Sequence, residues 1–489
     1  MTDSTGKLQA DLGANGPVFR HACDVLGRLY LQVEDEPGVQ VRFREWQSRT
    51  SASRRAPVGD EGLFVVHTYL ATLARLVALH HIRPNTFLPS RDDYVKVISG
   101  DYFRERDIYN FVEDDFFTWG LNPKALDDFL ELAERLMDAL TAYDLTGAGG
   151  RDLLKTLYYE MEHPESMRYR GEGHTPDRLA RRILSEELRI KDAPDLSVFD
   201  PACGPGTFLS TAIHLITEGM AGRGEDEFDT LLHVLNSVMG IDMNPLAVTV
   251  ARASYLLALG DLVSGPHPPV LVPVYLDDPI RVPDAGTSES LHIVQTTEPG
   301  VAFEIPDSLV DDPAQLDWIF HRMAQYLHAA EFRANVEGEE RATEEVINSL
   351  YAYLTSPKRA GLRELPPLSS FDAGVLCRTA RSLIKLVLEG KDTLWLHILK
   401  NDPATIYLSR RKFDLVVSSP PRLSTEQSNQ FFATSADLYL RDGGSIAFVM
   451  PRGVAATAGG GSLPGLEPDK TLELEDYSVW VARRGEVAG

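Results

Sequence analysis

The stretch Val198-Phe-Asp-Pro-Ala-Cys-Gly-Pro-Gly-Thr-Phe-Leu209 joins one apolar run to another through a turn that contains two glycines. The run from Leu196 to Phe199 predicts a buried strand, and the run from Thr207 to about Ile216 predicts a helix. Gly204 and Gly206 lie between them. In an open α/β sheet, such a unit presents backbone N–H groups and a helix N-terminus to a ligand. The stretch therefore predicts an α/β fold with a binding site at this turn.

The segments that follow predict further strands of one parallel sheet. A helix is expected from Pro245 to Leu259, and its spacing from the neighbouring strands fits right-handed βαβ crossovers. One more strand is expected within Thr471 to Ala482, where apolar residues alternate weakly. The predicted strands of the sheet are 196–199, 237–242, 270–276, 413–417 and 445–450.

Two helical parts flank and interrupt this sheet. Apolar residues recur at helical spacing in His67–Ile82 and Ala125–Tyr143, so residues 1–168 are interpreted as an N-terminal helical domain that serves for packing. Residues 281–404 are interpreted as a helical insertion, with helices at Ala314–Ala334, Glu344–Leu354 and Phe371–Asn401. The predicted domains are thus 1–168, a sheet domain formed by 169–280 and 405–489, and the insertion 281–404.

Composition places the chain among soluble proteins of the cytoplasm. Its 489 residues suit two or three domains, and 43% of them are hydrophobic. No uninterrupted apolar run approaches the roughly 20 residues of a membrane span, so no membrane association is expected. Cys23, Cys203 and Cys377 are few and far apart, which predicts no disulfide framework and a reducing compartment. Cys203 is expected to be a packing residue of the glycine turn.

The charge of the chain argues against a broadly basic nucleic-acid binder. The formal net charge is -24, and a protein that holds DNA by electrostatics alone needs a large excess of basic residues. One local cluster is basic, and a solvated loop or helix face is favoured over a phosphate-contacting patch there. The cluster consists of Arg42, Arg44, Arg49, Arg54 and Arg55, with Trp46 among them.

Three acids follow the first three predicted strands. Asp200 ends the first, Asp242 ends the second, and Asp278 follows the third. The carboxyl ends of parallel strands meet at one edge of the sheet, where a ligand lies at the switch point of the strand order. A carboxylate at Asp242 could accept both hydroxyls of a ribose, and one at Asp278 could accept from an adenine amino group. No Gly-Lys-Ser/Thr follows the turn, so a P-loop is excluded, whereas a dinucleotide site fits this geometry as well.

The segment Val417-Ser-Ser-Pro-Pro-Arg422 follows the fourth predicted strand. Pro420 and Pro421 fix the backbone and remove two donors, which leaves rigid carbonyl groups at the strand end. Ser419 adds one more acceptor. Such a group can hold an exocyclic amine by its hydrogens and aim the nitrogen lone pair at a methyl sulfonium, which is catalysis by positioning. A dinucleotide site would not require this element.

The order of these segments resembles that of the gamma-type DNA amino-methyltransferases of bacterial restriction-modification and phage-defence systems, which chiefly modify adenine N6. The resemblance covers most of the chain to about residue 453. It rests on Gly171-Glu-Gly-His-Thr-Pro176, Asp200-Pro-Ala-Cys-Gly-Pro-Gly-Thr-Phe-Leu209, Gly240-Ile-Asp-Met-Asn-Pro245, Phe413-Asp-Leu-Val-Val-Ser-Ser-Pro-Pro421 and Gly443-Gly-Ser-Ile-Ala-Phe-Val-Met-Pro451.

The resemblance implies a Rossmann-like sheet, S-adenosyl-L-methionine as the cofactor, no metal, and DNA as the partner. A separate specificity or restriction subunit is a further expected partner, because no target-recognition domain is evident in the chain. The residues expected to act in catalysis are Ser419, Pro420, Pro421 and Arg422. Those expected to bind the cofactor are Thr175, Asp200, Ala202, Gly204, Gly206, Thr207, Phe208, Asp242, Met243 and Asp278.

The chain departs from the family pattern at two positions. The catalytic segment of the family is usually Asn-Pro-Pro followed by an aromatic residue, whereas this chain has Ser419 and Arg422. A serine at the first position resembles the cytosine-N4 subgroup, so the target base stays open. Two alternatives follow: a degenerate methyltransferase fold that binds cofactor or a partner subunit without methyl transfer, and a methyltransferase that acts on a protein glutamine side chain.

Overall fold

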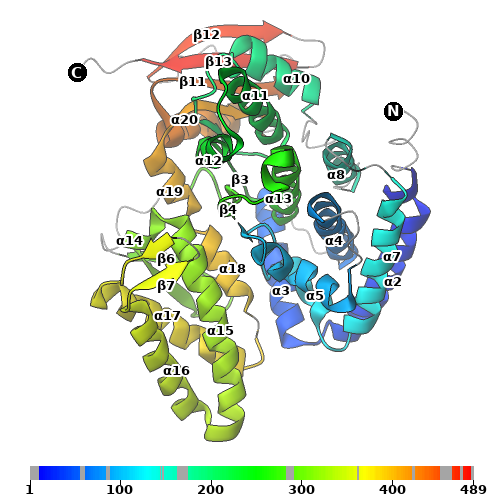
Figure 1. Cartoon of the computed structure of the whole chain (residues 1–489), viewed down its shortest axis with the longest axis vertical. Coiled ribbons are helices and arrows are strands. Elements are labelled where there is room, and N and C mark those ends of the chain that lie inside the picture. Colours follow the sequence, from blue (N-terminus) through cyan, green and yellow to red (C-terminus); the bar gives the residue numbers. More distant parts are fainter. Residues whose placement is uncertain are drawn as a thin grey trace.

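A seven-stranded sheet lies in the upper part of the molecule as drawn in Figure 1. The computed structural model describes residues 10–54, 61–83, 89–143, 145, 148–161, 175–281, 291–360, 363–391, 393–420, 425–451, 465–473 and 477–485. The strands of the sheet are β2 (Val198–Asp200), β3 (Val238–Asp242), β5 (Val274–Leu276), β10 (Phe413–Ser418), β11 (Leu440–Pro451), β12 (Leu466–Glu473) and β13 (Tyr477–Arg484).

The strand order is β12-β13-β11-β10-β2-β3-β5. Five strands from β11 to β5 run parallel, and β13 is antiparallel to both of its neighbours. The predicted α/β class with a largely parallel sheet is therefore confirmed, and this sheet is compatible with a methyltransferase-like fold. Chain order runs from β2 outward through β3 to β5 on one side and through β10 to β11 on the other. This switch point opens a crevice at the carboxyl ends of the strands.

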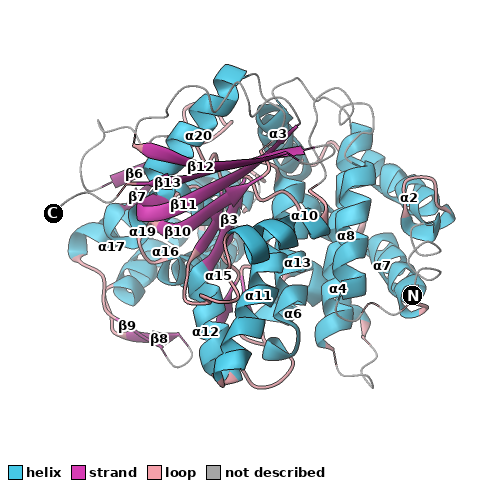
Figure 2. Ribbon diagram, turned by 90° about the horizontal axis from the view of Figure 1, so that it is seen from above, coloured by secondary structure: helices cyan, strands magenta, loops and turns pink. Residues whose placement is uncertain are grey.

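Helices cover both faces of the sheet, as Figure 2 shows. They are α11 (Thr207–Arg223), α12 (Glu227–Ser237) and α13 (Pro245–Leu259) on one face, and α19 (Ala404–Arg411) and α20 (Thr425–Tyr439) on the other. Successive side chains of a strand point to opposite faces. Val198 and Val417 accordingly pack with the first group of helices, and Phe199 and Val416 pack with the second. Burial on both faces explains the continuous apolar runs in the sequence of these strands.

The third predicted strand, Val270 to Leu276, is divided in the structure. Its first half, β4 (Val270–Leu271), leaves the sheet and pairs with β1 (Ile108–Tyr109) of the N-terminal part. Asn110 fixes the break, because its side chain donates to the Val272 carbonyl at 3.0 Å and accepts from the Val272 N–H at 2.8 Å. Only β5 pairs with β3. A contact from a residue 162 positions away in sequence thus decides where this strand begins.

Two other predicted elements are also divided. The weakly alternating segment near the C-terminus forms two antiparallel strands, β12 and β13, where one strand is predicted. The predicted helix from Phe371 to Asn401 forms α17 (Ser370–Leu388) and α18 (Leu394–Asn401). Gly390 ends α17 with a φ of 75°, a conformation that glycine adopts without strain.

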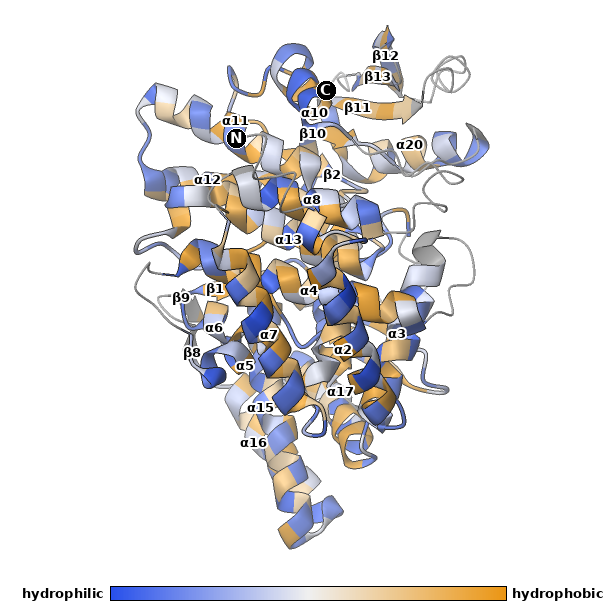
Figure 3. Ribbon diagram, turned by 90° about the vertical axis from the view of Figure 1, so that its right-hand side faces the viewer, coloured by the Kyte–Doolittle hydropathy of each residue, from blue (hydrophilic) through white to orange (hydrophobic). Residues whose placement is uncertain are grey.

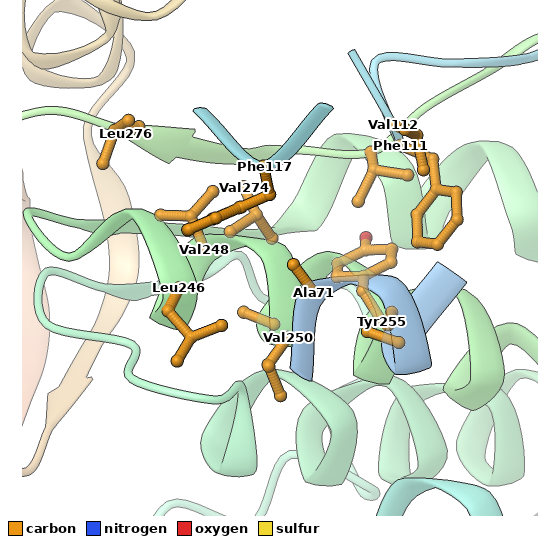
Figure 4. Packing of buried hydrophobic residues seen from close by; sticks show 14 of the residues in the cluster. Ala71, Phe111, Val112, Phe117, Leu246, Val248, Val250, Tyr255, Val274 and Leu276 are labelled. Carbon is orange, nitrogen blue, oxygen red and sulfur yellow. The ribbon is translucent and has the colours of Figure 1, made fainter. Parts of the chain in front are cut away.

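The N-terminal part is helical, as predicted. Its helices are α2 (Pro17–Val33), α3 (Pro37–Arg54), α4 (Glu61–Ile82), α5 (Arg91–Ser99), α6 (Asp101–Arg104), α7 (Leu126–Thr141) and α8 (Ala148–Met161), with the 3-10 helix η1 (Phe116–Leu121) between α6 and α7. Helix α4 packs on α13, where Ala71 lies beside Val250 and Tyr255 (Figure 4). Two segments, Glu61–Ile82 and Pro245–Val263, are long and apolar enough to cross a membrane, but 89% and 78% of their apolar windows are buried inside the protein. They are helices of the core.

The expectation that the basic cluster forms a solvated face is wrong for two of its members. Trp46 is fully buried, and Arg42 is 6% exposed. Arg42 donates to Asp114 at 2.8 Å and also to the main chain of Asp115. Arg42 and two hydroxyl donors lower the pKa of the Asp114 carboxyl to about 2. Arg55 and the side chain of Arg54 lie outside the described residues.

The insertion contains strands as well as the predicted helices. Two hairpins were not predicted, one formed by β6 (Leu291–Gln295) and β7 (Ala302–Pro306) and one by β8 (Lys358–Ala360) and β9 (Arg363–Leu365). Its helices are α14 (Asp307–Val310), α15 (Pro313–Glu337) and α16 (Glu339–Leu354), followed by α17 and α18. Helices α15 and α16 form an antiparallel pair that projects from the lower end of the molecule in Figure 3.

A buried set of charged and polar side chains, here called the junction network, joins the three parts of the chain. Glu113 of the N-terminal part accepts from Arg252 of α13 at 2.8 Å and lies 2.9 Å from His397 of α18. Lys400 of α18 bridges Glu113 and Asp317 at 3.3 and 2.9 Å. The members of the junction network are Arg104, Glu113, Arg252, Asp317, His397, Lys400 and Asn401.

One apolar core runs through all three predicted domains. It contains Phe64 of α4, Leu209 of α11 and Leu383 of α17. The predicted boundaries near residues 168 and 280 adjoin segments outside the described residues, 162–174 and 282–290. The division into three domains therefore stays a prediction.

Candidate cofactor site at the carboxyl ends of the parallel strands

A pocket opens at the switch point of the sheet. It collects residues that are far apart in sequence, from the ends of β2, β3, β5 and β10, the start of α11, the middle of α20 and the end of α8. The residues that line it are Tyr158, Tyr159, Thr175, Asp200, Pro201, Ala202, Cys203, Gly204, Pro205, Thr207, Phe208, Asp242, Met243, Asn244, Asp278, Pro279, Ile280, Ser419 and Phe431.

Ten of the predicted site residues line this one pocket. Of the remaining four, Gly206 and Pro420 are not among the residues that line the pocket. Pro421 and Arg422 lie outside the described residues. The ten are Thr175, Asp200, Ala202, Gly204, Thr207, Phe208, Asp242, Met243, Asp278 and Ser419. The structure thus brings them together, and the role of each stays a prediction.

The glycine turn brings the start of α11 close to the end of β3. Gly204 and Gly206 have φ angles of 51° and 86°, which favour glycine. A Cβ atom on Gly206 would lie 3.3 Å from Ala251 of α13, tighter than an ordinary contact. The Gly204 N–H donates to Asp242 at 2.9 Å. The turn therefore fixes the position of the Asp242 carboxylate as well as that of its own backbone.

Asp200 is buried beneath the pocket with two donors. It is 1% exposed, and its Oδ1 accepts from the Ser418 hydroxyl at 2.8 Å and from the Ala202 N–H at 3.1 Å. Burial raises the pKa of this carboxyl to about 7 in spite of these bonds, and the nearby Asp242 adds to the shift. Asp200 therefore takes up a proton close to neutral pH. The contact with Ser418, from the next strand, was not predicted.

Cys203 lies in the same turn, and its thiol is buried. Burial and the charges of Asp242 and Asp200 raise its pKa well above the usual value. A thiol must be deprotonated to act as a nucleophile. The position therefore suits the packing role expected from the sequence.

Asp242 projects into the pocket from the end of β3. Its Oδ1 accepts from the Asn244 N–H at 2.8 Å, and its Oδ2 accepts from Gly204. These two backbone donors fix the orientation of the Asp242 carboxylate, which lines the pocket. Asn244 in turn caps α13, because its side chain accepts from the Leu246 N–H at 2.9 Å. The acid is thus held between a turn and a helix N-terminus.

The two acids after β5 have different surroundings. Asp277 is buried, accepts from the Thr405 hydroxyl at 2.7 Å and pairs with Arg281 at 3.3 Å. Its neighbour Asp278 lines the pocket and accepts from the Ile280 N–H at 3.0 Å. Asp277 therefore fastens the start of the insertion, and Asp278 is the acid available to a ligand.

Several pocket residues were not predicted from the sequence. The N-terminal part was interpreted as a packing domain, yet Tyr158 and Tyr159 of α8 line the pocket. Phe431 of α20 also lines it. Asn244 could have been predicted as a helix cap, because an asparagine before a proline is common at the start of a helix. No local sequence pattern predicts the place of the two tyrosines, since it depends on how α8 packs on α13.

Charge distinguishes this pocket from a site for an anion. Among the described residues that line it there are three aspartates and no lysine or arginine. The described part of the chain holds no group of three His, Cys, Asp or Glu residues arranged to bind a metal ion. The Thr207 hydroxyl, at the start of α11, is buried and has no hydrogen-bond partner among the described residues. A ligand that fills the pocket therefore meets carboxylates and an unsatisfied hydroxyl group.

Comparison with known proteins gives one similar sequence and several solved structures that align with the chain. No protein-family model matches the chain. Over 133 residues it is 30% identical to the adenine-specific methyltransferase PglX of Streptomyces coelicolor, a match that covers 26% of this chain and 11% of that protein. The chain thus spans about a tenth of the length of this curated relative.

Three solved structures align with most of the chain, at TM-scores below 0.5. The Type ISP restriction-modification enzyme LlaBIII bound to DNA aligns with 99% of this chain and 29% of its own, at 9% identity and a TM-score of 0.44. The DrdV–DNA complex aligns with 99% and 41%, at 11% identity and a TM-score of 0.46. A modification subunit of a putative type I restriction enzyme from Vibrio vulnificus YJ016 aligns with 92% and 82%, at 12% identity and a TM-score of 0.34. The sequence similarity to an adenine-specific methyltransferase is thus confined to about a quarter of the chain.

Proposed function

We propose that the chain is an S-adenosyl-L-methionine-dependent methyltransferase that acts on an exocyclic amine of a DNA base, adenine N6 in the first place, within a restriction-modification or phage-defence system. One observation carries the proposal. Asp200, Asp242 and Asp278 follow successive parallel strands, and all three line one pocket with Ser419 at the end of the neighbouring strand. The match to PglX supports the class of substrate.

The residues of the pocket fit this cofactor. Its three carboxylates, with no basic side chain among the described lining residues, suit a ligand that carries positive charge and hydroxyl and amino donors. The buried Thr207 hydroxyl offers a hydrogen bond that no described residue accepts. Phe208, Met243 and Ile280 supply apolar surface for a purine ring. When bound, the cofactor would supply an electrophilic methyl group next to Ser419.

Each polar residue has a distinct task in this proposal. Asp242, held by Gly204 and Asn244, accepts from the ribose hydroxyls, and Asp278 accepts from the purine amino group. The Ser419 side chain and the Pro420 carbonyl accept the hydrogens of the target amine and so orient its lone pair. Ser418 holds Asp200 and thereby fixes the end of β10 against the glycine turn.

Calorimetric titration with S-adenosylmethionine tests the cofactor assignment. The unaltered chain should bind with a micromolar Kd, about -8 kcal/mol. Asp242→Ala should weaken binding at least tenfold, since hydrogen bonds to a charged group contribute about 1.5–3 kcal/mol each. Asp35→Ala, at an exposed site of the N-terminal part, is the matched control. Normal binding by a folded Asp242→Ala variant would refute the assignment.

Transfer of a labelled methyl group tests the substrate. Label in DNA adenine supports the proposal, label in cytosine N4 corrects the target base, and label in protein alone supports the glutamine alternative. Ser419, where relatives usually have asparagine, favours a second candidate: a fold that binds cofactor without methyl transfer. Activity gained only in a Ser419→Asn, Arg422→Tyr double variant would establish that candidate, and activity of the unaltered chain would exclude it.

A further inference from the structure

Helix α8 connects the N-terminal helices to the pocket. It packs against α4 and α13, and its last turn carries Tyr158 and Tyr159 into the pocket lining. Tyr158 is 5% exposed, and Tyr159 is partly exposed. Their rings meet edge to face with centroids 5.4 Å apart. The two tyrosines therefore form a continuous aromatic wall, of which Tyr159 is the part more open to solvent.

Tyr158 is fastened to the turn that carries Asp242. The Asn244 side-chain amide donates to the Tyr158 hydroxyl at 3.4 Å, and both residues are buried. The Asn244 N–H donates to Asp242, and the Asn244 carbonyl oxygen of the side chain caps α13. A movement of α8 at this end would therefore be transmitted to the acid of the pocket through a single intervening residue.

The same face of α8, one turn earlier, contacts the segment that borders the pocket near Thr175. Lys155, one turn before the tyrosines, is 6% exposed and pairs with Asp177 at 2.5 Å. Asp177 begins α10 (Asp177–Arg182), two residues after Thr175. Thr175 itself lines the pocket. Helix α8 thus spans two pocket segments that are separated by more than 60 residues in sequence, Thr175 and Asn244.

We infer that α8 is a wall of the cofactor pocket, in which the Tyr159 ring packs against the bound S-adenosyl group and Tyr158 positions the Asp242 turn through Asn244. This inference rests on the proposed function. The tyrosine face is apolar and rich in π electrons, so it suits both the flat purine and the cationic sulfonium of this ligand. Cofactor binding is thereby coupled to the packing of α8 on α13, and the N-terminal helices sense whether the pocket is filled.

Two calorimetric variants test the wall. Tyr159→Ala should bind S-adenosylmethionine about tenfold more weakly, whereas Tyr159→Phe, which keeps the ring, should restore binding to within about threefold. Tyr351→Ala, at an exposed tyrosine of α16, is the matched control and should bind like the unaltered chain. Thermal unfolding of each variant identifies any loss of affinity that comes from misfolding.

Hydrogen exchange tests the coupling. Saturating S-adenosylmethionine should slow amide exchange in residues 148–161 of the unaltered chain at least about threefold, and it should do so less in Tyr158→Phe, which lacks the hydroxyl that Asn244 bonds. Normal affinity of Tyr159→Ala, or exchange in α8 that does not respond to bound cofactor, would overturn the inference while leaving the proposed function intact. Absence of binding by the unaltered, folded chain would instead refute the proposed function, and the inference with it.

Discussion

The pocket and the junction network are both polar clusters assembled from distant segments, but their charges are arranged in opposite ways. In the junction network the carboxylates of Glu113 and Asp317 each lie within hydrogen-bonding distance of cationic side chains. In the pocket, three carboxylates lie together, and none of the described lining residues is a lysine or arginine. A cluster that satisfies its own charges stabilises the fold, whereas one that does not is arranged for a ligand.

The same contrast appears in the acidity of the buried acids. Burial alone would raise the pKa of Glu113, but Lys400, His397 and Arg252 hold it well below its usual value. Burial does raise the pKa of Asp200, to about 7, because its donors are neutral and its charged neighbour is another acid. Ionised Glu113 therefore stabilises the folded chain, and ionised Asp200 destabilises it.

Removal of the central acid of the junction network should have the largest effect on stability. Glu113→Gln leaves Arg252 buried without its carboxylate and Lys400 paired with Asp317 alone, which should lower the free energy of unfolding by about 3–5 kcal/mol. Denaturant unfolding at pH 7 measures it. Glu340→Gln, at an exposed position at the start of α16, is the control. A loss below about 1 kcal/mol would show that the junction network is hydrated and contributes little.

The matching substitution of a pocket acid should raise the free energy of unfolding instead of lowering it. A carboxyl whose pKa is raised on folding binds more protons in the folded than in the unfolded chain between about pH 4 and 7, so its contribution to stability falls as pH rises through that window. Asp200→Asn cannot ionise and should be more stable than the unaltered chain by about 2–4 kcal/mol at pH 8. At pH 4 the two should be equal within about 1 kcal/mol.

Unfolding free energies of both proteins across pH 4–8 measure this difference. Asp35→Asn, exposed and distant from the pocket, should leave the pH dependence unchanged. A stability gap between Asp200→Asn and the unaltered chain that does not grow with pH would contradict the raised pKa. Reduced binding of S-adenosylmethionine by the more stable variant would show that the acid is retained for function at the expense of stability.

The pocket acids could be located from sequence because each follows an apolar run that predicts a strand. Asp200, Asp242 and Asp278 needed only the rule that parallel strands end at one edge. Tyr158 and Phe431 needed the packing of whole helices, which local patterns do not contain. The division of the strand 270–276 and the burial of Arg42 have the same origin, since Asn110 and Asp114 reach them from distant segments. The local pattern of apolar residues predicts helices and strands, and tertiary contacts then determine where they end and which side chains are buried.

Asn244 lines the pocket and also caps α13, so its substitution should moderately lower both the affinity for the cofactor and the free energy of unfolding. Asn244→Ala removes the cap of α13 and should lower the free energy of unfolding by about 1–2 kcal/mol. Asn244→Ser keeps a capping hydroxyl but cannot donate to Tyr158 at the same reach, so it should retain most of the stability and lose cofactor affinity. If the serine variant bound the cofactor as tightly as the unaltered chain, the hydrogen bond between Asn244 and Tyr158 would not contribute to cofactor binding.

Ion pairs on the surface provide the smallest effect and complete the comparison. Glu345 of α16 pairs with Arg333 at 3.1 Å, and the two side chains are 40% and 44% exposed. Solvent and salt screen such a pair, so Arg333→Ala should change the free energy of unfolding by less than about 0.5 kcal/mol, and the change should vanish at 1 M salt. The effect of Glu113→Gln should persist at that salt concentration, because the junction network is buried. If both effects were equally sensitive to salt, burial would not be what distinguishes the two kinds of ion pair.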